Sequence, residues 1–183
     1  MKFVESYLRG AYIVEVEPSV DERGLFGRTF CQNEFSKVGF KKQIVQINHS
    51  ITKKKGTVRG MHFQFPPACE IKIIRCISGS VFDVMVDLRS GSSTFLRWDA
   101  TELSKENMRM VYVPDGFAHG FQALTNEVEL IYHHSEFYNP EHESGIRFDD
   151  PKLAISWPLS VALVSPKDQS YQLLDSNFLG INI

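Results

Sequence analysis

The chain has 183 residues, 43% hydrophobic and 23% charged, which is enough for one buried core and too short for two large domains separated by a cleft. A formal net charge of −2 gives no general field for attracting nucleic acid or an anionic membrane. The three cysteines form no CxxC pair and no run of 18 uncharged apolar residues occurs. We therefore expect a soluble cytoplasmic protein, without disulfides, that binds neither nucleic acid nor membrane.

Short runs rich in β-branched and aromatic residues recur along the chain, at residues 11–18, 42–50, 71–89, 108–124 and 128–138. Gly, Pro, Asn and Asp clusters separate them, which predicts an antiparallel sandwich or barrel. Helical signals are limited to one or two turns within 31–40 and a short capped turn from Ser104. We expect an all-β fold in a single domain over 1–183, with short peripheral helices and a C-terminal tail or lid at 169–183.

The run 80–89 shows how such a strand would face its surroundings. Alternation places an entirely apolar set on one face, namely Phe82, Val84, Val86 and Leu88. The opposite face is mixed, because it carries Asp83 and Asp87 between Val81 and Met85. The pattern predicts that the apolar set is the core side.

The run 58–75 places polar groups in a predominantly apolar stretch. His62 and Gln64 point the same way by alternation, and Arg59, Lys72 and Arg75 lie within 17 residues of one another. A lone histidine in an apolar strand is best interpreted as a hydrogen-bonded core residue. Several polar groups together are costly in a core unless they line a water-filled pocket, so this run predicts a site.

The run 113–121, VPDGFAHGF, combines a Pro-Gly turn with His119 between two aromatic residues. Its P-x-G-x-x-H spacing resembles the second half of the cupin signature, in which that histidine often binds a metal. A metal site would need an H-x-H pair in the first half, where this chain has His62-Phe63-Gln64, and an amide is a poor ligand for a transition metal. We therefore expect no metal and no cofactor. The remaining histidines lack ligand spacing and are interpreted as surface or structural residues: His49, His133, His134 and His142.

Ordered motifs from about Asp21 to Asp168 resemble the dTDP-4-dehydrorhamnose 3,5-epimerase family, metal-free cupin-fold enzymes that act on nucleotide-linked 4-keto-6-deoxy sugars. The motifs are DERG, NHS, RGMHFQ, FDVMVDLR, VPDGFAHGF, IYHHSEFYNPE, FDDP, WP and SPKD. The resemblance implies a cupin-like antiparallel β-sandwich or jelly-roll barrel that inverts C3 and C5 of such a sugar. It also implies a role in deoxysugar and polysaccharide biosynthesis, and a homodimer whose pockets include N-terminal residues of the partner.

The resemblance also assigns catalytic roles. Epimerisation beside the C4 ketone needs a base, a stabiliser of the enolate oxygen and a proton donor on the opposite face of the sugar. Matching positions make His62 the base, oriented by Asp168, and Lys72 the enolate stabiliser. Tyr132 would be the proton donor, provided that nearby cations lower its pKa.

Eight further positions match substrate-binding residues of the family. The arginines would contact the diphosphate, His119 the reacting sugar, and Tyr138 the sugar ring. The full set is Arg23, Gln46, Asn48, Arg59, His119, Tyr138, Glu143 and Lys167.

Three positions depart from the family pattern. Ile47 and Arg28 stand where the family has nucleotide-side carboxylates, which leaves the nucleobase open. Glu70 is charged where the family is usually not, and could pair with Lys72 or a sugar hydroxyl. Three alternatives also remain open: inversion of only one carbon, a non-catalytic sugar-nucleotide-binding cupin, and a metal cupin, which Gln64 disfavours.

Overall fold

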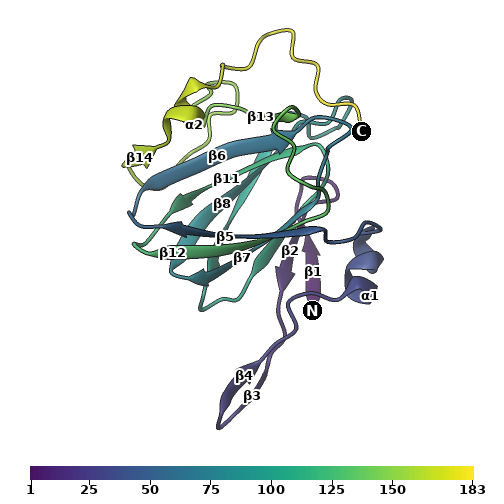
Figure 1. Ribbon diagram of the computed structural model, residues 1–183, viewed down its shortest axis with the longest axis vertical. Coiled ribbons are helices and arrows are strands. Elements are labelled where there is room, and N and C mark those ends of the chain that lie inside the picture. The colour runs from purple at the N-terminus through teal and green to yellow at the C-terminus, as the bar shows by residue number, and fades with distance from the viewer.

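The computed structural model describes residues 1–183 and contains two six-stranded sheets packed face to face, antiparallel except where the short strand β14 (Leu163–Val164) pairs with β6 (Thr57–Gln64) (Figure 1). The first sheet has the order β1 (Lys2–Glu5), β2 (Tyr12–Glu15), β10 (Met110–Val113), β7 (Lys72–Ser78), β12 (Val128–His134) and β5 (Gln46–Thr52). The second has the order β13 (Glu143–Gly145), β6 (Thr57–Gln64), β11 (Phe117–Ala123), β8 (Ser80–Asp87) and β9 (Trp98–Ser104). Such an all-β sandwich confirms the expected fold class.

The remaining elements are short and peripheral. They are the hairpin β3 (Ser19–Asp21) and β4 (Gly24–Phe26), the strand β14 (Leu163–Val164), the helices α1 (Gln32–Phe35) and α2 (Pro166–Ser170), and the 3₁₀ turn η1 (Ser36–Val38). The turns at 31–40 were expected from the sequence. The β3–β4 hairpin projects away from the sandwich (Figure 1). None of the helices is long and apolar enough to cross a membrane.

The interior between the sheets is apolar at one end and polar at the other. The apolar end is a cluster of buried side chains that includes Ile74, Val81, Met85, Phe121 and Leu130. Burial of each such side chain stabilises the fold by roughly 1.5–3 kcal/mol. This cluster holds the two sheets together, so that the polar end can remain open as a cavity.

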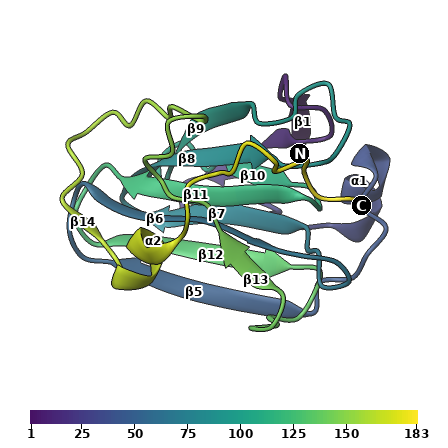
Figure 2. The same cartoon turned by 90° about the horizontal axis from the view of Figure 1, so that it is seen from above.

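The second sheet is buried on its outer face as well. Val84 and Val86 of β8, and Leu88 just after it, pack there against Leu153 and Ile181. These two residues belong to the C-terminal part of the chain, residues 147–183, whose last stretch runs over β6 and β11 (Figure 2). The apolar set is therefore buried in a core, as predicted, and this core lies between the second sheet and the C-terminal part of the chain. The mixed set of β8 faces the sandwich interior, because Val81 and Met85 belong to the inner cluster.

A bulge between β6 and β11 shapes the site. His119 pairs with His62, but Phe121 pairs with Arg59, so β6 contains one extra residue at this point. Gly60 occupies the bulge with φ +121°, and a Cβ there would meet the Cα atom of Gly120 at 2.6 Å. The close approach requires glycine, and the bulge lets Arg59 reach the same cavity as His62.

Candidate active site

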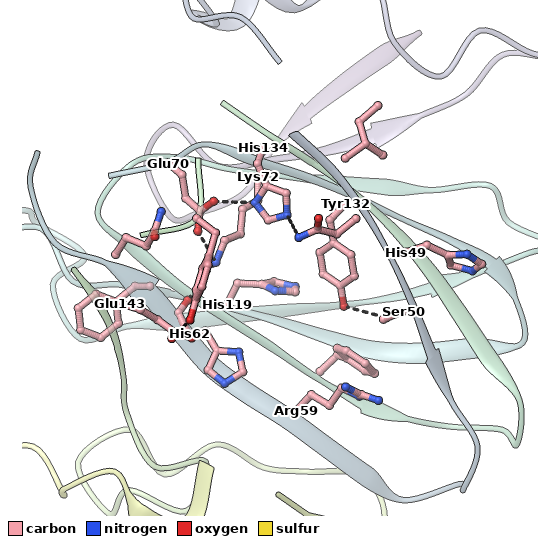
Figure 3. Close-up of a pocket in the computed structure, with 16 residues that line it drawn as sticks. His49, Ser50, Arg59, His62, Glu70, Lys72, His119, Tyr132, His134 and Glu143 are labelled. Atoms are coloured by element: carbon pink, nitrogen blue, oxygen red, sulfur yellow. Dashed lines mark hydrogen bonds and ion pairs between the residues drawn. The ribbon is translucent and has the colours of Figure 1, made fainter. Parts of the chain in front are cut away.

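A cavity of about 550 Å³ opens between the sheets, at the polar end of the sandwich. Its wall is built from β5, β6, β7, β11, β12 and β13, so residues far apart in sequence converge on it (Figure 3). Eight of the twelve predicted site residues line it: Asn48, Arg59, His62, Lys72, His119, Tyr132, Tyr138 and Glu143. Three others contact lining residues, namely Gln46, Lys167 and Asp168.

Asp168 lies behind His62, as the family motif implied. Ser165 caps α2 by accepting a hydrogen bond from the Asp168 backbone N–H at 3.0 Å. The Asp168 carboxylate then meets His62 Nε2 at 2.7 Å and accepts a hydrogen bond from Gly60 N–H at 3.2 Å. Burial by itself raises the pKa of Asp168, but the hydrogen bond and charge of His62 outweigh burial and lower it.

The ionised Asp168 carboxylate can only accept a hydrogen bond, so Nε2 of His62 carries the ring proton. Nδ1 is then the basic nitrogen. The His62 side chain is 34% exposed, which leaves its ring accessible from the cavity, whereas the Asp168 side chain is only 5% exposed. The pair has the geometry of a proton-abstracting imidazole held by a buried carboxylate.

Lys72 begins β7 and extends its ammonium into the cavity. Its Nζ donates to the main-chain oxygen of His62 at 3.3 Å and forms an ion pair with Glu70 Oε1 at 3.1 Å. The side chain is 9% exposed, so the charge is held in a largely desolvated position. The pairing with Glu70 confirms one of the two partners expected for that carboxylate.

Tyr132 lies on β12 across the cavity from His62 (Figure 3). Its ring meets His119 edge-on at 6.2 Å and stacks on His134 at 6.0 Å, while Ser50 donates to its hydroxyl at 3.5 Å. Burial raises the pKa of Tyr132 above its ordinary value of 10.0. The expectation that cations lower this pKa was wrong, because desolvation of the phenolate exceeds their effect.

His119 is held by a carboxylate that the sequence did not identify as a site residue. Both oxygens of the completely buried Asp83 lie within 3.0 Å of His119 Nε2. Burial raises the pKa of Asp83, and the nearby imidazole opposes this rise. The sequence signal that could have identified Asp83 is its place among the apolar residues of β8, because a carboxylate is costly to bury without a partner.

The side-chain amide of Gln64 forms its hydrogen bonds with main-chain atoms of neighbouring loops. Its amide donates to Ala68 O at 3.0 Å and to Phe137 O at 3.3 Å, and its oxygen accepts from Asn139 N–H at 2.6 Å. These bonds fix the two loops at the cavity rim. No group of three or more metal-ligating His, Cys, Asp or Glu side chains occurs in the structure.

A second polar network lies at the cavity mouth. Glu143 Oε2 accepts from Lys167 Nζ at 2.6 Å and from the Tyr138 hydroxyl at 2.7 Å. Gln46 accepts from the Tyr138 backbone N–H at 3.1 Å and donates to Asn48 at 3.2 Å. These five residues therefore form one rim, and the 55% exposure of Tyr138 leaves its ring available to a ligand.

Arg23 is the one predicted site residue that does not lie at this cavity. It is at the tip of the β3–β4 hairpin, where its side chain is 86% exposed and pairs with Asp21. Arg28 pairs with Glu34 at 2.8 Å, also outside the cavity, whereas Ile47 lines it. Arg23 therefore does not reach the cavity of its own chain, because the hairpin points away from its own sandwich (Figure 1), and its substrate-binding role stays a prediction.

Comparison with known proteins agrees with this geometry. The family model described as dTDP-4-dehydrorhamnose 3,5-epimerase matches residues 5–176. The dTDP-4-dehydrorhamnose 3,5-epimerase of Methanothermobacter thermautotrophicus is 42% identical, over 96% of both chains. The dTDP-4-dehydrorhamnose 3-epimerase of Streptomyces niveus is 39% identical, over 91% of this chain and 81% of its own.

A solved structure shares the fold closely. The RmlC dTDP-6-deoxy-D-glucose-3,5-epimerase of Legionella pneumophila, in complex with dTDP-4-keto-L-rhamnose, superposes with a TM-score of 0.92 at 36% identity. The match covers 100% of this chain and 98% of that one. The chain therefore belongs to the dTDP-4-dehydrorhamnose 3,5-epimerase family, and it is an isomerase with a cupin-like fold.

Proposed function

We propose that this enzyme inverts C3 and C5 of a nucleotide-linked 4-keto-6-deoxyhexose, of the dTDP-4-dehydro-6-deoxyglucose type, by proton abstraction and reprotonation. The observation that carries the proposal is the convergence of His62, Lys72 and Tyr132 on one cavity, with Asp168 directly behind His62. A base, an enolate stabiliser and a proton donor are the three groups that epimerisation beside a ketone requires.

In this mechanism His62 Nδ1 removes the proton from the sugar carbon while Asp168 stabilises the imidazolium that forms. The Lys72 ammonium lies near the C4 oxygen, where negative charge develops in the enolate. Tyr132 then delivers a proton from the opposite face. Its raised pKa keeps the phenol protonated before this step, so the enolate must be basic enough to take the proton.

The rim would hold the nucleotide part of the substrate. Arg59 lies beside the proposed base and would contact the diphosphate, while His119 would form a hydrogen bond with the sugar from its fixed place beside Asp83. The rim residues proposed to bind the ligand are Gln46, Asn48, Tyr138, Glu143 and Lys167. Ile47 lines the cavity at 61% exposure, so the proposal leaves the nucleobase to experiment.

We further propose a homodimer in which Arg23 serves the partner's cavity. The β3–β4 hairpin projects from its own sandwich and exposes Val20, Leu25 and Phe26 by 57% or more. Exposed apolar side chains on a projecting hairpin favour contact with a second chain. One domain over 1–183 and a cytoplasmic location complete the proposal, the latter supported by three cysteines held as free thiols.

Inversion of a single carbon is the second candidate, because the Streptomyces niveus relative is named a 3-epimerase. Both reactions use the same base and acid, so the product decides between them. A binding protein without activity would need neither group.

Deuterium exchange tests the proposal directly. The protein is incubated in D2O with dTDP-, CDP-, GDP- and UDP-4-keto-6-deoxyglucose, and C3 and C5 are followed by NMR. We expect exchange at both carbons with at least one nucleotide. Exchange at one carbon only would establish the single-carbon epimerase, and no exchange with any nucleotide would exclude both reactions.

A further inference from the structure

The cavity wall behind Lys72 holds a carboxylate for which the proposed reaction has no use. Glu70 lines the cavity two residues before β7, and its two oxygens contact two different basic side chains (Figure 3). Oε1 lies 3.1 Å from Lys72 Nζ, and Oε2 lies 2.6 Å from His134 Nδ1. All three side chains are 10% exposed or less.

Glu70 is ionised in this position. Burial alone raises its pKa, but the hydrogen bond from His134 and the charge of Lys72 outweigh burial and lower it. An ionised carboxylate accepts, so His134 Nδ1 donates the hydrogen bond. His134 is fixed from its other side, because its Nε2 lies 3.3 Å from the Asn48 amide. The chain of contacts therefore runs from β5 through β12 to Lys72.

These contacts determine where the lysine ammonium points. An ammonium group has three N–H donors. Glu70 takes one and the main-chain oxygen of His62 takes a second, at 3.3 Å. These two contacts fix the direction of the third N–H, and because Lys72 lines the cavity, this N–H is available to a ligand there. A free lysine side chain loses rotamer entropy when it is held in one geometry, so fixation before the substrate binds favours the reaction step.

We propose that Glu70 is a positioning residue for Lys72, and that His134 holds Glu70 in place. Glu70 holds the ammonium aimed at the C4 oxygen, and it does not contact the substrate itself. This inference rests on the proposed function, since it assigns Lys72 to the enolate oxygen. It also assigns a role to Glu70, which is charged where the family usually has an uncharged residue.

The variant Glu70→Gln tests the inference, because it keeps the shape of the side chain and removes its charge. We expect kcat to fall about 10-fold or more while KM stays within about threefold, since the loss is specific to the transition state.

Two companion variants complete the experiment. His134→Phe retains the ring that stacks on Tyr132 and removes the hydrogen bond to Glu70, so kcat should fall in the same direction by about threefold. Glu15→Gln is the matched control, because Glu15 on β2 also pairs with two cations, Lys2 and Arg109, outside the cavity. Its kinetics should equal those of wild type.

Three results would overturn the inference. An increase of KM with kcat unchanged in Glu70→Gln would mean that Glu70 binds the sugar directly. Wild-type kinetics in this variant would mean that Glu70 neither positions Lys72 nor binds the sugar. A kcat loss of the same size in Glu15→Gln would make the effect unspecific. If Glu70→Gln does not fold, as judged by circular dichroism, His134→Phe decides by the same criteria. Absence of exchange in wild type would instead reject the proposed function.

Discussion

The two walls of the cavity hold their polar groups in different ways. On the β6 wall, His62 has one side-chain partner, Asp168, and its side chain remains 34% exposed. On the β7 and β12 wall, Lys72, Glu70 and His134 are connected to one another and are 10% exposed or less. The base is thus left open to substrate, while the charge-stabilising group is fixed before substrate arrives.

This difference has a chemical reason. A base must approach a carbon-bound proton closely, and it changes its own charge during the reaction. An enolate stabiliser keeps its charge, so fixation in a desolvated wall strengthens its interaction with the developing oxyanion. The two walls are therefore expected to respond differently to substitution.

The largest effect is expected on the base wall. His62→Asn removes the only proposed base, so deuterium exchange at both C3 and C5 should fall by about 10²–10⁴-fold. NMR in D2O measures both carbons in one experiment. His133→Asn is the matched control, because His133 precedes His134 on β12 but does not line the cavity. Exchange at the wild-type rate in His62→Asn would remove His62 from its proposed role.

Tyr132→Phe separates the two faces of the sugar. The base still removes protons in this variant, so exchange should remain within about 10-fold of wild type, whereas inversion should fall about 100-fold. Exchange and product are followed together by NMR. Tyr112→Phe serves as control, since Tyr112 is buried in a cluster outside the cavity. Equal loss of exchange and inversion would assign Tyr132 a structural role instead.

Gly145→Ala tests how the base is supported. Gly145 lies opposite His62 in the β13–β6 pairing, and a Cβ there would lie 2.3 Å from the Tyr171 ring, which meets His62 edge-on at 6.0 Å. Displacement of the ring should destabilise the fold by about 1–3 kcal/mol and lower kcat. Gly91→Ala is a control position without neighbours within 4 Å, although its φ of +71° adds some backbone strain.

Removal of the Tyr171 ring should reverse the destabilisation caused by Gly145→Ala. The double variant Gly145→Ala with Tyr171→Ala removes the clash, so it should unfold at higher urea concentration than Gly145→Ala alone. Failure to recover would place the origin of the defect elsewhere.

The smallest expected effect is a pH dependence of stability from Asp168. Its pKa is lowered in the folded protein, so its contribution is fully present above the unfolded value near 3.8 and is lost as pH falls through the lower folded pKa. Wild type should therefore lose stability relative to Asp168→Asn as pH falls from about 5 to about 3. Urea unfolding across this range measures the difference.

Asp149→Asn is the comparison variant, because Asp149 pairs with Arg147 in an exposed position where solvent screens the interaction. A pH dependence of equal size in both variants would contradict a special role for the buried pair.

Much of the fold could be predicted from the sequence. Strand runs, peripheral turns and the shared direction of His62 and Gln64 follow from periodicity, which is local. The side of β8 that faces the cavity could not be predicted, because alternation identifies two faces without indicating what covers each one. The C-terminal part of the chain covers the apolar face, so the mixed face lies between the two sheets.

The site residues also fall into those that the sequence predicted and those that only the structure revealed. Family motifs identified eleven residues that line the cavity or contact its lining, and Asp168 lies against His62 although the two are 106 positions apart. The pairing of Glu70 with Lys72 was one of two expected for that carboxylate. The motifs did not reveal Asp83 as the partner of His119, nor the place of His134 in the cavity wall. His134 was interpreted as a surface or structural histidine, and the structure shows it hydrogen-bonded and lining the site.

The sequence by itself determined the sheet-forming pattern and the family, and through the family motif it predicted His62 as the base, because each depends on residue types and their local spacing. Only the tertiary structure decided which charges meet. Glu70 and His134 are 64 residues apart, and the β6 bulge turns Arg59 into the cavity against simple alternation. Such pairings depend on how the strands align between the sheets, and strand alignment is set by the whole core rather than by any one segment.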